Sequence, residues 1–284
     1  MSRGILLVAL LTPFTSQGDI DTEALQAHVA DLRAAGVDGF FLCGTTGEGP
    51  LLDDDEVLLI TRTVLGVCGA GSVVITQVGR PSTRATLRLL DKALEAGVNG
   101  ATAVTPYYYE LDGPRLEAHY RELLQASSGH PLYAYVIPRR AGNDIDADLA
   151  SRLAHIGLAG IKDSTRSVER HCEYLKIASE LNTRFEVYMG TDGLALEALQ
   201  RGSTGIVSAI ANLHPELFLN LRNAALNSHS QDAISCQDEI NQLRTSLQHG
   251  DTIANLKLGV RTRLEKSRVP YPSSLRMPLG VSEP

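Results

Sequence analysis

The chain of 284 residues contains no tryptophan, few aromatic residues and only four cysteines. These cysteines, Cys43, Cys68, Cys172 and Cys236, are widely separated and form no C-x-x-C pair. This scatter argues against a disulfide scaffold and against a cysteine-based zinc site. It favours reduced thiols, and therefore a cytoplasmic protein.

An excess of positive charge and a long apolar segment are also lacking. The chain carries 26 Lys and Arg against 33 Asp and Glu, a net charge of -7, whereas nucleic-acid binders normally present a basic face. The apolar run Ile5–Leu11 is interrupted by Thr12-Pro13, so it is too short to span a membrane, and no signal-peptide cleavage site follows it. We expect a cytoplasmic protein that binds neither nucleic acid nor membranes.

Short apolar runs alternate along the chain with longer segments of helical periodicity. The runs are continuously apolar, as is typical of parallel strands covered by helices. Eight successive units of this kind predict a (β/α)8 TIM barrel. The expected strands are 5–10, 39–43, 73–78, 101–104, 132–136, 159–162, 185–189 and 205–208.

The pattern changes after the eighth expected strand. Three helical segments, 215–227, 231–248 and 253–266, follow one another without strands between them. The first of them completes the barrel, and no linker composition marks an independent second domain. The sequence therefore predicts a barrel over residues 1–227 and a C-terminal helical extension and tail over residues 228–284.

Lys162 is the strongest candidate for a catalytic residue in the sequence. Active sites of such barrels lie at the C-terminal ends of the strands, and Lys162 ends an apolar run. Desolvation there would lower the pKa of the amine, giving a neutral nucleophile able to form a Schiff base with a ketone. A lysine paired with a carboxylate at the rim is the alternative, and it is the more common situation for a lone lysine.

Hydroxyl groups follow other expected strands and could move the protons that imine formation requires. Tyr135, Tyr108 and Thr45 all lie at strand ends, so they could form a proton relay beside Lys162. The loop Gly44–Gly49 has the spacing G-x-x-G-x-G, which is neither a dinucleotide fingerprint nor a P-loop. We interpret it as a tight turn that presents threonines and backbone N–H groups to a carboxylate.

The arginine and histidine side chains give weaker evidence of a functional role. Arg139 and Arg140 follow the fifth expected strand, where a guanidinium could hold a substrate carboxylate, although a solvated loop arginine is as common. The eight histidines show no metal-ligand spacing, and no nucleophile elbow supports a serine hydrolase. We expect no metal and no cofactor.

Several motifs together resemble the dihydrodipicolinate synthase / N-acetylneuraminate lyase family of class I, Schiff-base-forming pyruvate aldolases. They occur in the family's order and extend over nearly the whole chain. The motifs are Leu11-Thr12-Pro13-Phe14, Gly44-Thr45-Thr46-Gly47-Glu48, Val104-Thr105-Pro106-Tyr107-Tyr108, Tyr135-Val136-Ile137-Pro138, Gly160-Ile161-Lys162-Asp163 and Gly190-Thr191-Asp192.

The resemblance implies catalytic roles for four residues. Lys162 would form the Schiff base with pyruvate, and Tyr135 would transfer protons. Thr45 and Tyr108 would complete the relay, with Tyr108 reaching across a dimer interface into the neighbouring site. The resemblance also implies a homotetramer built as a dimer of dimers.

Further residues would bind substrate. Thr46 and Gly47 would hold the pyruvate carboxylate, and Val207 and Gly190 would line the pocket. Arg140 matches the arginine with which synthases of the family bind the carboxylate of the aldehyde substrate.

The identity of the aldehyde stays open between two activities. Arg140 favours a synthase that joins pyruvate to aspartate semialdehyde. Two features depart from the usual synthase pattern. They are Val136 and the segment Gln77-Val78-Gly79-Arg80 at the end of the third expected strand. Three other segments resemble 2-keto-3-deoxy-sugar-acid aldolases, and an N-acetylneuraminate lyase-like activity is a further alternative. The three aldolase-like segments are Gly47-Glu48-Gly49-Pro50, Tyr107-Tyr108-Tyr109 and Gly142-Asn143-Asp144-Ile145-Asp146.

Two other classes compete with a Schiff-base aldolase. A non-catalytic barrel that senses a keto acid would form no covalent adduct with pyruvate, and a metal-dependent aldolase would be inhibited by chelators. The presence of both Lys162 and Tyr135 favours the enzyme.

Overall fold

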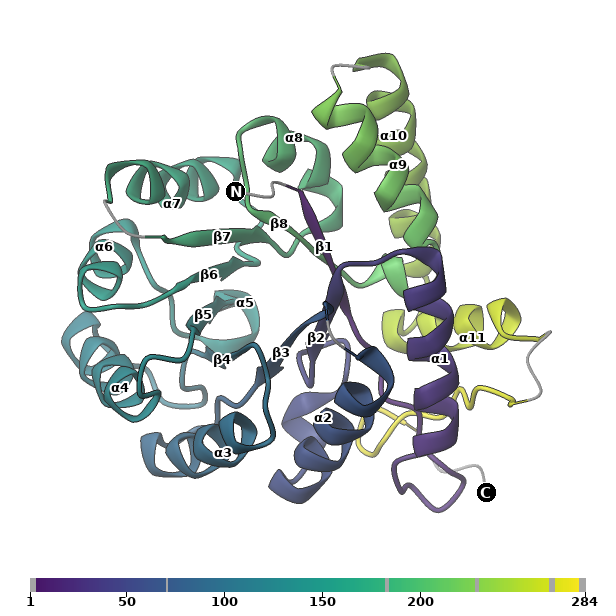
Figure 1. Cartoon of the computed structure of the whole chain (residues 1–284), viewed down its shortest axis with the longest axis horizontal. Coiled ribbons are helices and arrows are strands. Elements are labelled where there is room, and N and C mark those ends of the chain that lie inside the picture. Colours follow the sequence, from purple (N-terminus) through teal and green to yellow (C-terminus); the bar gives the residue numbers. More distant parts are fainter. Residues whose placement is uncertain (1–3, 70, 182–183, 228–229, 266–268, 281–284) are drawn as a thin grey trace. The chain divides into compact units, whose positions relative to one another are not determined.

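The eight expected strands form a closed parallel barrel in the order β1 to β8 (Figure 1). The computed structural model of the chain describes residues 4–69, 71–181, 184–227, 230–265 and 269–280. The (β/α)8 prediction is therefore confirmed. The strands are β1 (Ile5–Ala9), β2 (Gly39–Leu42), β3 (Val73–Gln77), β4 (Gly100–Val104), β5 (Leu132–Val136), β6 (Gly160–Asp163), β7 (Glu186–Met189) and β8 (Gly205–Ser208).

Helices follow the strands along the chain, and most of them begin at a side-chain cap. Asp21, Ser82 and Asp146 each accept a hydrogen bond from a backbone N–H of the first turn, which satisfies a donor that the helix leaves unpaired. The helices are α1 (Thr22–Ala35), α2 (Asp54–Cys68), α3 (Thr83–Glu95), α4 (Gly113–Ala126), α5 (Pro138–Ala141), α6 (Ala147–His155), α7 (Val168–Glu180), α8 (Ala195–Gln200), α9 (Pro215–Leu226), α10 (Ser230–Leu247) and α11 (Thr252–Arg263), with short 3-10 turns η1 (Gly49–Leu51), η2 (Asp192–Leu194) and η3 (Ile210–Asn212).

The chain divides into two compact units. The first unit comprises residues 1–5 and 75–207, and the second comprises residues 6–74 and 208–284. Each unit contains barrel strands as well as helices. The division of the chain after residue 227 stays a prediction. The end of the third C-terminal helix expected there, Lys266, lies outside the described residues.

In the first unit, the register of the parallel strands determines which residues lie side by side on neighbouring strands. Tyr135 on β5 pairs with Lys162 on β6, which pairs with Tyr188 on β7. Paired residues of neighbouring parallel strands point to the same face of the sheet, so these three side chains share one level and one face. The register thus brings the expected nucleophile beside the expected proton-transfer residue.

In the second unit, the C-terminal helix and tail complete a separate apolar cluster. Tyr271 is buried with Leu11, which lies two residues after β1, and with Leu256 and Val260 from α11. The segment 269–280 is therefore packed into this unit, although it contains no helix or strand. Among the described residues, no helix has the length and apolar character needed to cross a membrane.

Candidate active site

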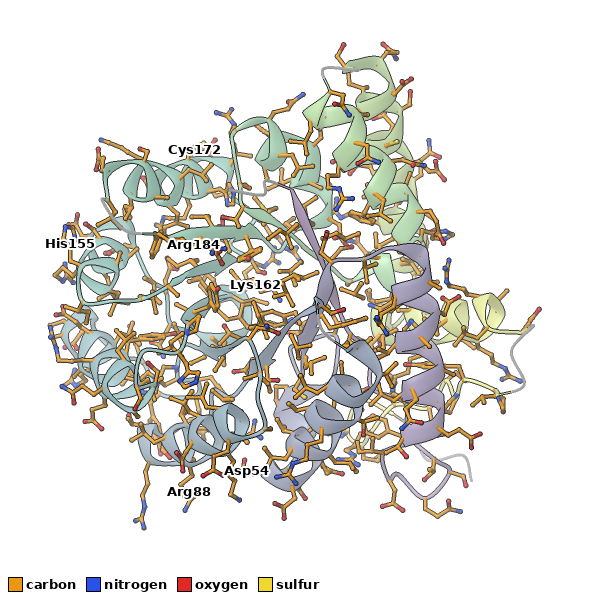
Figure 2. The ribbon with its side chains drawn as sticks, in the orientation of Figure 1. Asp54, Arg88, His155, Lys162, Cys172 and Arg184 are labelled. Atoms are coloured by element: carbon orange, nitrogen blue, oxygen red, sulfur yellow. The ribbon has the colours of Figure 1, made fainter. Side chains whose placement is uncertain are left out.

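Lys162 lies near the end of β6 and is almost completely buried, with 6% of its surface exposed (Figure 2). Its Nζ lies 3.9 Å from the centroid of the Tyr135 ring. Burial lowers the pKa of the amine from 10.5 to about 7, against an opposing effect of the Asp192 carboxylate. Much of the amine is therefore neutral and nucleophilic near neutral pH.

Two glycines make room for Lys162 and its strand. A Cβ on Gly160 would lie 2.0 Å from the Glu186 carbonyl oxygen, so only glycine lets β6 and β7 approach at this point. A Cβ on Gly190 would lie 3.1 Å from Cε of Lys162 and 2.3 Å from Oγ of Ser164. Gly190, a predicted site residue, therefore lies directly against the lysine side chain.

Tyr135 differs from the other tyrosines inside these strands in what surrounds it. The hydroxyls of Tyr133 and Tyr188 both donate to Oε2 of the buried Glu186, at 2.7 and 3.0 Å. Burial and the Glu186 carboxylate raise the pKa of both hydroxyls. The Tyr133 and Tyr188 hydroxyls are therefore poor proton donors. Of these three tyrosines, Tyr135 is the one whose ring lies against the Lys162 amine.

Asp192 is a functional candidate that the sequence analysis did not assign. It begins η2, directly after β7, and its carboxylate raises the pKa of Lys162 in opposition to burial. The available signal was its position in the motif Gly190-Thr191-Asp192. Only the structure identifies it as a charged neighbour of the lysine.

A buried Asp–His–Ser network holds the end of β6 and was also missed. The Asp163 carboxylate lies 2.9 Å from Nδ1 of His171, and Nε2 of His171 lies 2.5 Å from Oγ of Ser203. Asp163 also accepts from the backbone N–H of Thr165 at 2.8 Å. All members of the Asp163–His171–Ser203 chain are only 1% exposed. Since no substrate can reach Ser203, this network positions the strand that carries Lys162 and is not a hydrolase triad.

The loop after β4 presents Tyr108 to solvent. Tyr108 is 87% exposed, has a φ of 85° and contacts Tyr109 edge-to-face, with ring centroids 5.1 Å apart. The Asn143 side chain holds the loop by donating to the carbonyls of Pro106 and Tyr109 at 2.7 and 2.8 Å. An exposed aromatic ring on a backbone that non-glycine residues rarely adopt is a candidate for contact with another molecule.

The remaining first-unit candidates are Arg140 and Val207. Arg140 lies on the short helix α5, and its side chain is exposed, like that of Arg139. The helix forms because Pro138 occupies its first turn and Gly142, in a left-handed conformation, ends it. Val207 is buried on β8.

The predicted carboxylate-binding residues form a tight turn in the second unit. Thr45 and Thr46 are half-buried after β2, and the Gly47 carbonyl accepts a hydrogen bond from the Thr12 hydroxyl at 2.8 Å. A Cβ on Gly47 would lie 2.7 Å from the Leu10 carbonyl oxygen. The turn is closed by a bond from the Glu48 N–H to the Thr45 carbonyl at 3.1 Å.

A metal-ligand cluster was not expected from the sequence. Within the residues that the structure describes, no group of three or more His, Cys, Asp or Glu side chains is arranged to hold a metal ion.

Comparison with known proteins assigns the family. The family model described as "Dihydrodipicolinate synthetase family" matches residues 2–283. A 4-hydroxy-tetrahydrodipicolinate synthase from Natronomonas pharaonis is 32% identical over 277 residues, which cover 97% of this chain and 91% of that protein.

Two solved structures show the same fold with different ligands. One is a prophage protein of the dihydrodipicolinic acid synthase family from E. coli K12 in complex with pyruvate, with a TM-score of 0.89, 26% identity and coverage of 98% and 92% of the two chains. The other is a 2-keto-3-deoxygluconate aldolase from Sulfolobus in complex with D-KDPG, with a TM-score of 0.87, 26% identity and coverage of 99% and 91%. With its barrel and the family match over almost its whole length, the chain belongs to the dihydrodipicolinate synthetase family and is a carbon–carbon lyase.

Proposed function

We propose that this protein is a pyruvate-dependent class I aldolase that uses Lys162 as its Schiff-base nucleophile. The observation that carries this assignment is a buried amine with a pKa of about 7, 3.9 Å from the ring of Tyr135. An amine in this state attacks ketones without a metal or cofactor. The related prophage protein solved with pyruvate supports pyruvate as the ketone.

The reaction follows from these groups. Nζ of Lys162 adds to C2 of pyruvate, and the resulting carbinolamine loses water to give an iminium ion. Loss of a methyl proton produces an enamine, whose terminal carbon adds to the aldehyde carbonyl and forms the new C–C bond. Water then releases the product and restores the amine, and cleavage is the same sequence reversed.

Protons must move at the carbinolamine and enamine stages, and we assign this transfer to Tyr135. The relay roles of Thr45 and Tyr108 remain predictions, as does the homotetramer in which Tyr108 would reach a neighbouring site. The exposure of Tyr108 supports that assignment. Carboxylate binding by Thr46 and Gly47, and pocket lining by Gly190 and Val207, belong to the same proposal.

For the aldehyde, we favour an acidic acceptor such as aspartate semialdehyde, because Arg140 is exposed on α5 after the strand that carries Tyr135. A specific observation favours the sugar-acid alternative. The Gln77 side chain accepts from the backbone N–H groups of Gly79 and Val104 at the end of β3, in the segment whose sequence differs from the synthase pattern. The relative solved with D-KDPG supports that alternative.

A panel of aldehydes offered with pyruvate tests the acceptor. We expect Arg140→Ala to raise KM for an acidic aldehyde by about 10- to 100-fold, since a hydrogen bond to a charged group contributes roughly 1.5–3 kcal/mol. Neutral hydroxyaldehydes should be affected much less, and Arg139→Ala is the matched comparison on the same helix. Equal KM values for the acidic aldehyde in Arg140→Ala and the wild type would refute the assignment of Arg140.

The rate of imine formation should fall as pH drops below about 7, because protonation of Lys162 removes the nucleophile. The Asp192 carboxylate raises this pKa, so Asp192→Asn should move the acidic limb to lower pH. The measurement is the initial rate of borohydride-trapped pyruvate adduct across pH 5 to 9 in both proteins. A limb that moves to higher pH in the variant would contradict this electrostatic account.

A further inference from the structure

A cluster of buried charged side chains lies next to the Thr45–Gly47 turn in the second unit. Glu48 follows Gly47 directly, and its side chain is completely buried. Its Oε1 lies 2.6 Å from Nζ of Lys257, and its Oε2 accepts from the backbone N–H of Arg276 at 2.9 Å. Both carboxylate oxygens of this loop residue are thus bound by residues from the C-terminal region.

The partners of Glu48 are themselves held together. Lys257, on α11, is fully buried and also donates to the carbonyl of Ser274 at 2.7 Å. The Ser274 hydroxyl donates to the carbonyl of Phe14 at 3.2 Å, and the Lys257 Nζ lies 4.4 Å from the centroid of the Phe14 ring. Burial lowers the pKa of Lys257, and the Glu48 carboxylate opposes that shift.

Arg276 fastens the same segment to the start of α2. Its guanidinium donates to Oε2 of Glu56 at 2.5 Å and to the carbonyls of Leu51 and Gly18, and it lies 4.5 Å from the centroid of the Phe14 ring. We call residues 269–280 the C-terminal strap. In Figure 1 the strap, in yellow, returns from α11 toward α2.

The backbone of Glu48 explains why this anchoring matters to the turn. Glu48 has a φ of 57°, in the left-handed region that side-chain-bearing residues adopt only when the surroundings impose it. The same residue supplies the N–H that closes the turn on Thr45. Loss of the Lys257 amine would leave the buried Glu48 carboxylate without its counter-charge. Loss of the Arg276 guanidinium would release the segment whose backbone N–H binds Oε2 of Glu48. In either case the turn would relax.

We propose that the C-terminal strap positions the Thr45–Gly47 turn for binding the substrate carboxylate, with Lys257 and Arg276 acting through Glu48 as positioning residues. This role depends on the proposed function, in which Thr46 and Gly47 hold the pyruvate carboxylate. The strap would therefore act mainly on affinity for pyruvate, through Thr46 and Gly47, with a smaller effect on turnover through Thr45.

The test compares KM for pyruvate and kcat in Lys257→Met, Arg276→Gln and Arg263→Gln. Arg263 is the matched control because it also tethers α11 through ion pairs, but to Asp31 and Glu216. We expect the first two variants to raise KM for pyruvate at least 10-fold and to lower kcat by a smaller factor, because Thr45 of the proposed relay lies in the same turn. Arg263→Gln should lower Tm while KM stays within twofold. Adding Glu48→Gln to Lys257→Met should recover part of the lost affinity, because no unpaired charge then remains buried.

The outcomes separate this role from general stabilisation. If Lys257→Met and Arg276→Gln lower Tm but leave KM for pyruvate at the wild-type value, the strap has no positioning role. If Lys257→Met does not fold, Arg276→Gln and the double variant decide the matter by the same KM criterion. If the wild-type protein forms no adduct with pyruvate and borohydride, both the proposed function and the role of the strap are wrong. If the adduct forms but KM for pyruvate is unchanged in the variants, only the role of the strap is wrong.

Discussion

Lys162→Met is expected to abolish the aldol reaction, with a loss of at least about 10⁴-fold in kcat, the scale seen when a covalent nucleophile is removed. Methionine has a similar length and fills the same space without an amine, so no imine can form. The assay is pyruvate-dependent aldol synthesis and cleavage at saturating substrate. Residual activity within tenfold of the wild type would contradict the assignment of Lys162.

The same substitution should stabilise the protein. The pKa of Lys162 is about 7 in the folded state and close to 10.5 in the unfolded chain. Between these values the unfolded state binds more protons, so the contribution of Lys162 to stability increases with pH across that window and is least favourable below about 7. Methionine removes this cost, and we expect a higher Tm at pH 6 to 7, by roughly 2–4 °C for each kcal/mol gained.

Lys257→Met is the matched control for stability. Lys257 is also a fully buried lysine, but its Nζ lies 2.6 Å from the Glu48 carboxylate. Its removal leaves a buried anion without its partner, so Tm should fall. Thermal unfolding of the two variants at pH 7 checks the contrast, and a lower Tm for Lys162→Met would contradict the burial cost assigned to Lys162.

Tyr135→Phe is expected to slow catalysis by about 10²- to 10⁴-fold, the usual contribution of a positioned acid–base group. The ring that lies against Lys162 is retained, so the burial of the amine should persist. The equilibrium yield of trapped imine should therefore approach that of the wild type, while the single-turnover rate of its formation falls.

Tyr133→Phe provides the control for Tyr135, since both lie on β5 and both are buried. The Tyr133 hydroxyl is bonded to Glu186, so its loss should cost roughly 1–3 kcal/mol of stability and leave the rate of imine formation nearly unchanged. A similar rate loss in both variants would mean that Tyr135 has no special role in proton transfer.

The fold was accessible from sequence because parallel barrel strands are buried on both faces and therefore form continuous apolar runs. β5 occupies the predicted range, and β6 begins and ends one residue later than expected. The position of Lys162 at a strand end depended only on this local pattern. The family motifs then pointed to the chemistry, and the family match agrees with them.

The long-range polar networks were not accessible. His171 was set aside because it shows no metal spacing, and its pairing with Asp163 and Ser203 depends on how α7 packs. Glu48 and Lys257 lie on separate elements far apart in sequence, and no local periodicity relates them. The four-residue helix that carries Arg140 was not predicted, because two arginines after a proline do not reveal it.

Peptide mapping after reduction with borohydride in the presence of pyruvate shows directly which lysine forms the Schiff base. The chain offers several amines for comparison, at Lys92, Lys162, Lys176, Lys257 and Lys266. We expect a reduced pyruvyl adduct on Lys162, loss of activity in proportion to that adduct, and no incorporation in Lys162→Met. An adduct on another lysine, or full turnover with no adduct at Lys162, would show that Lys162 is not the nucleophile.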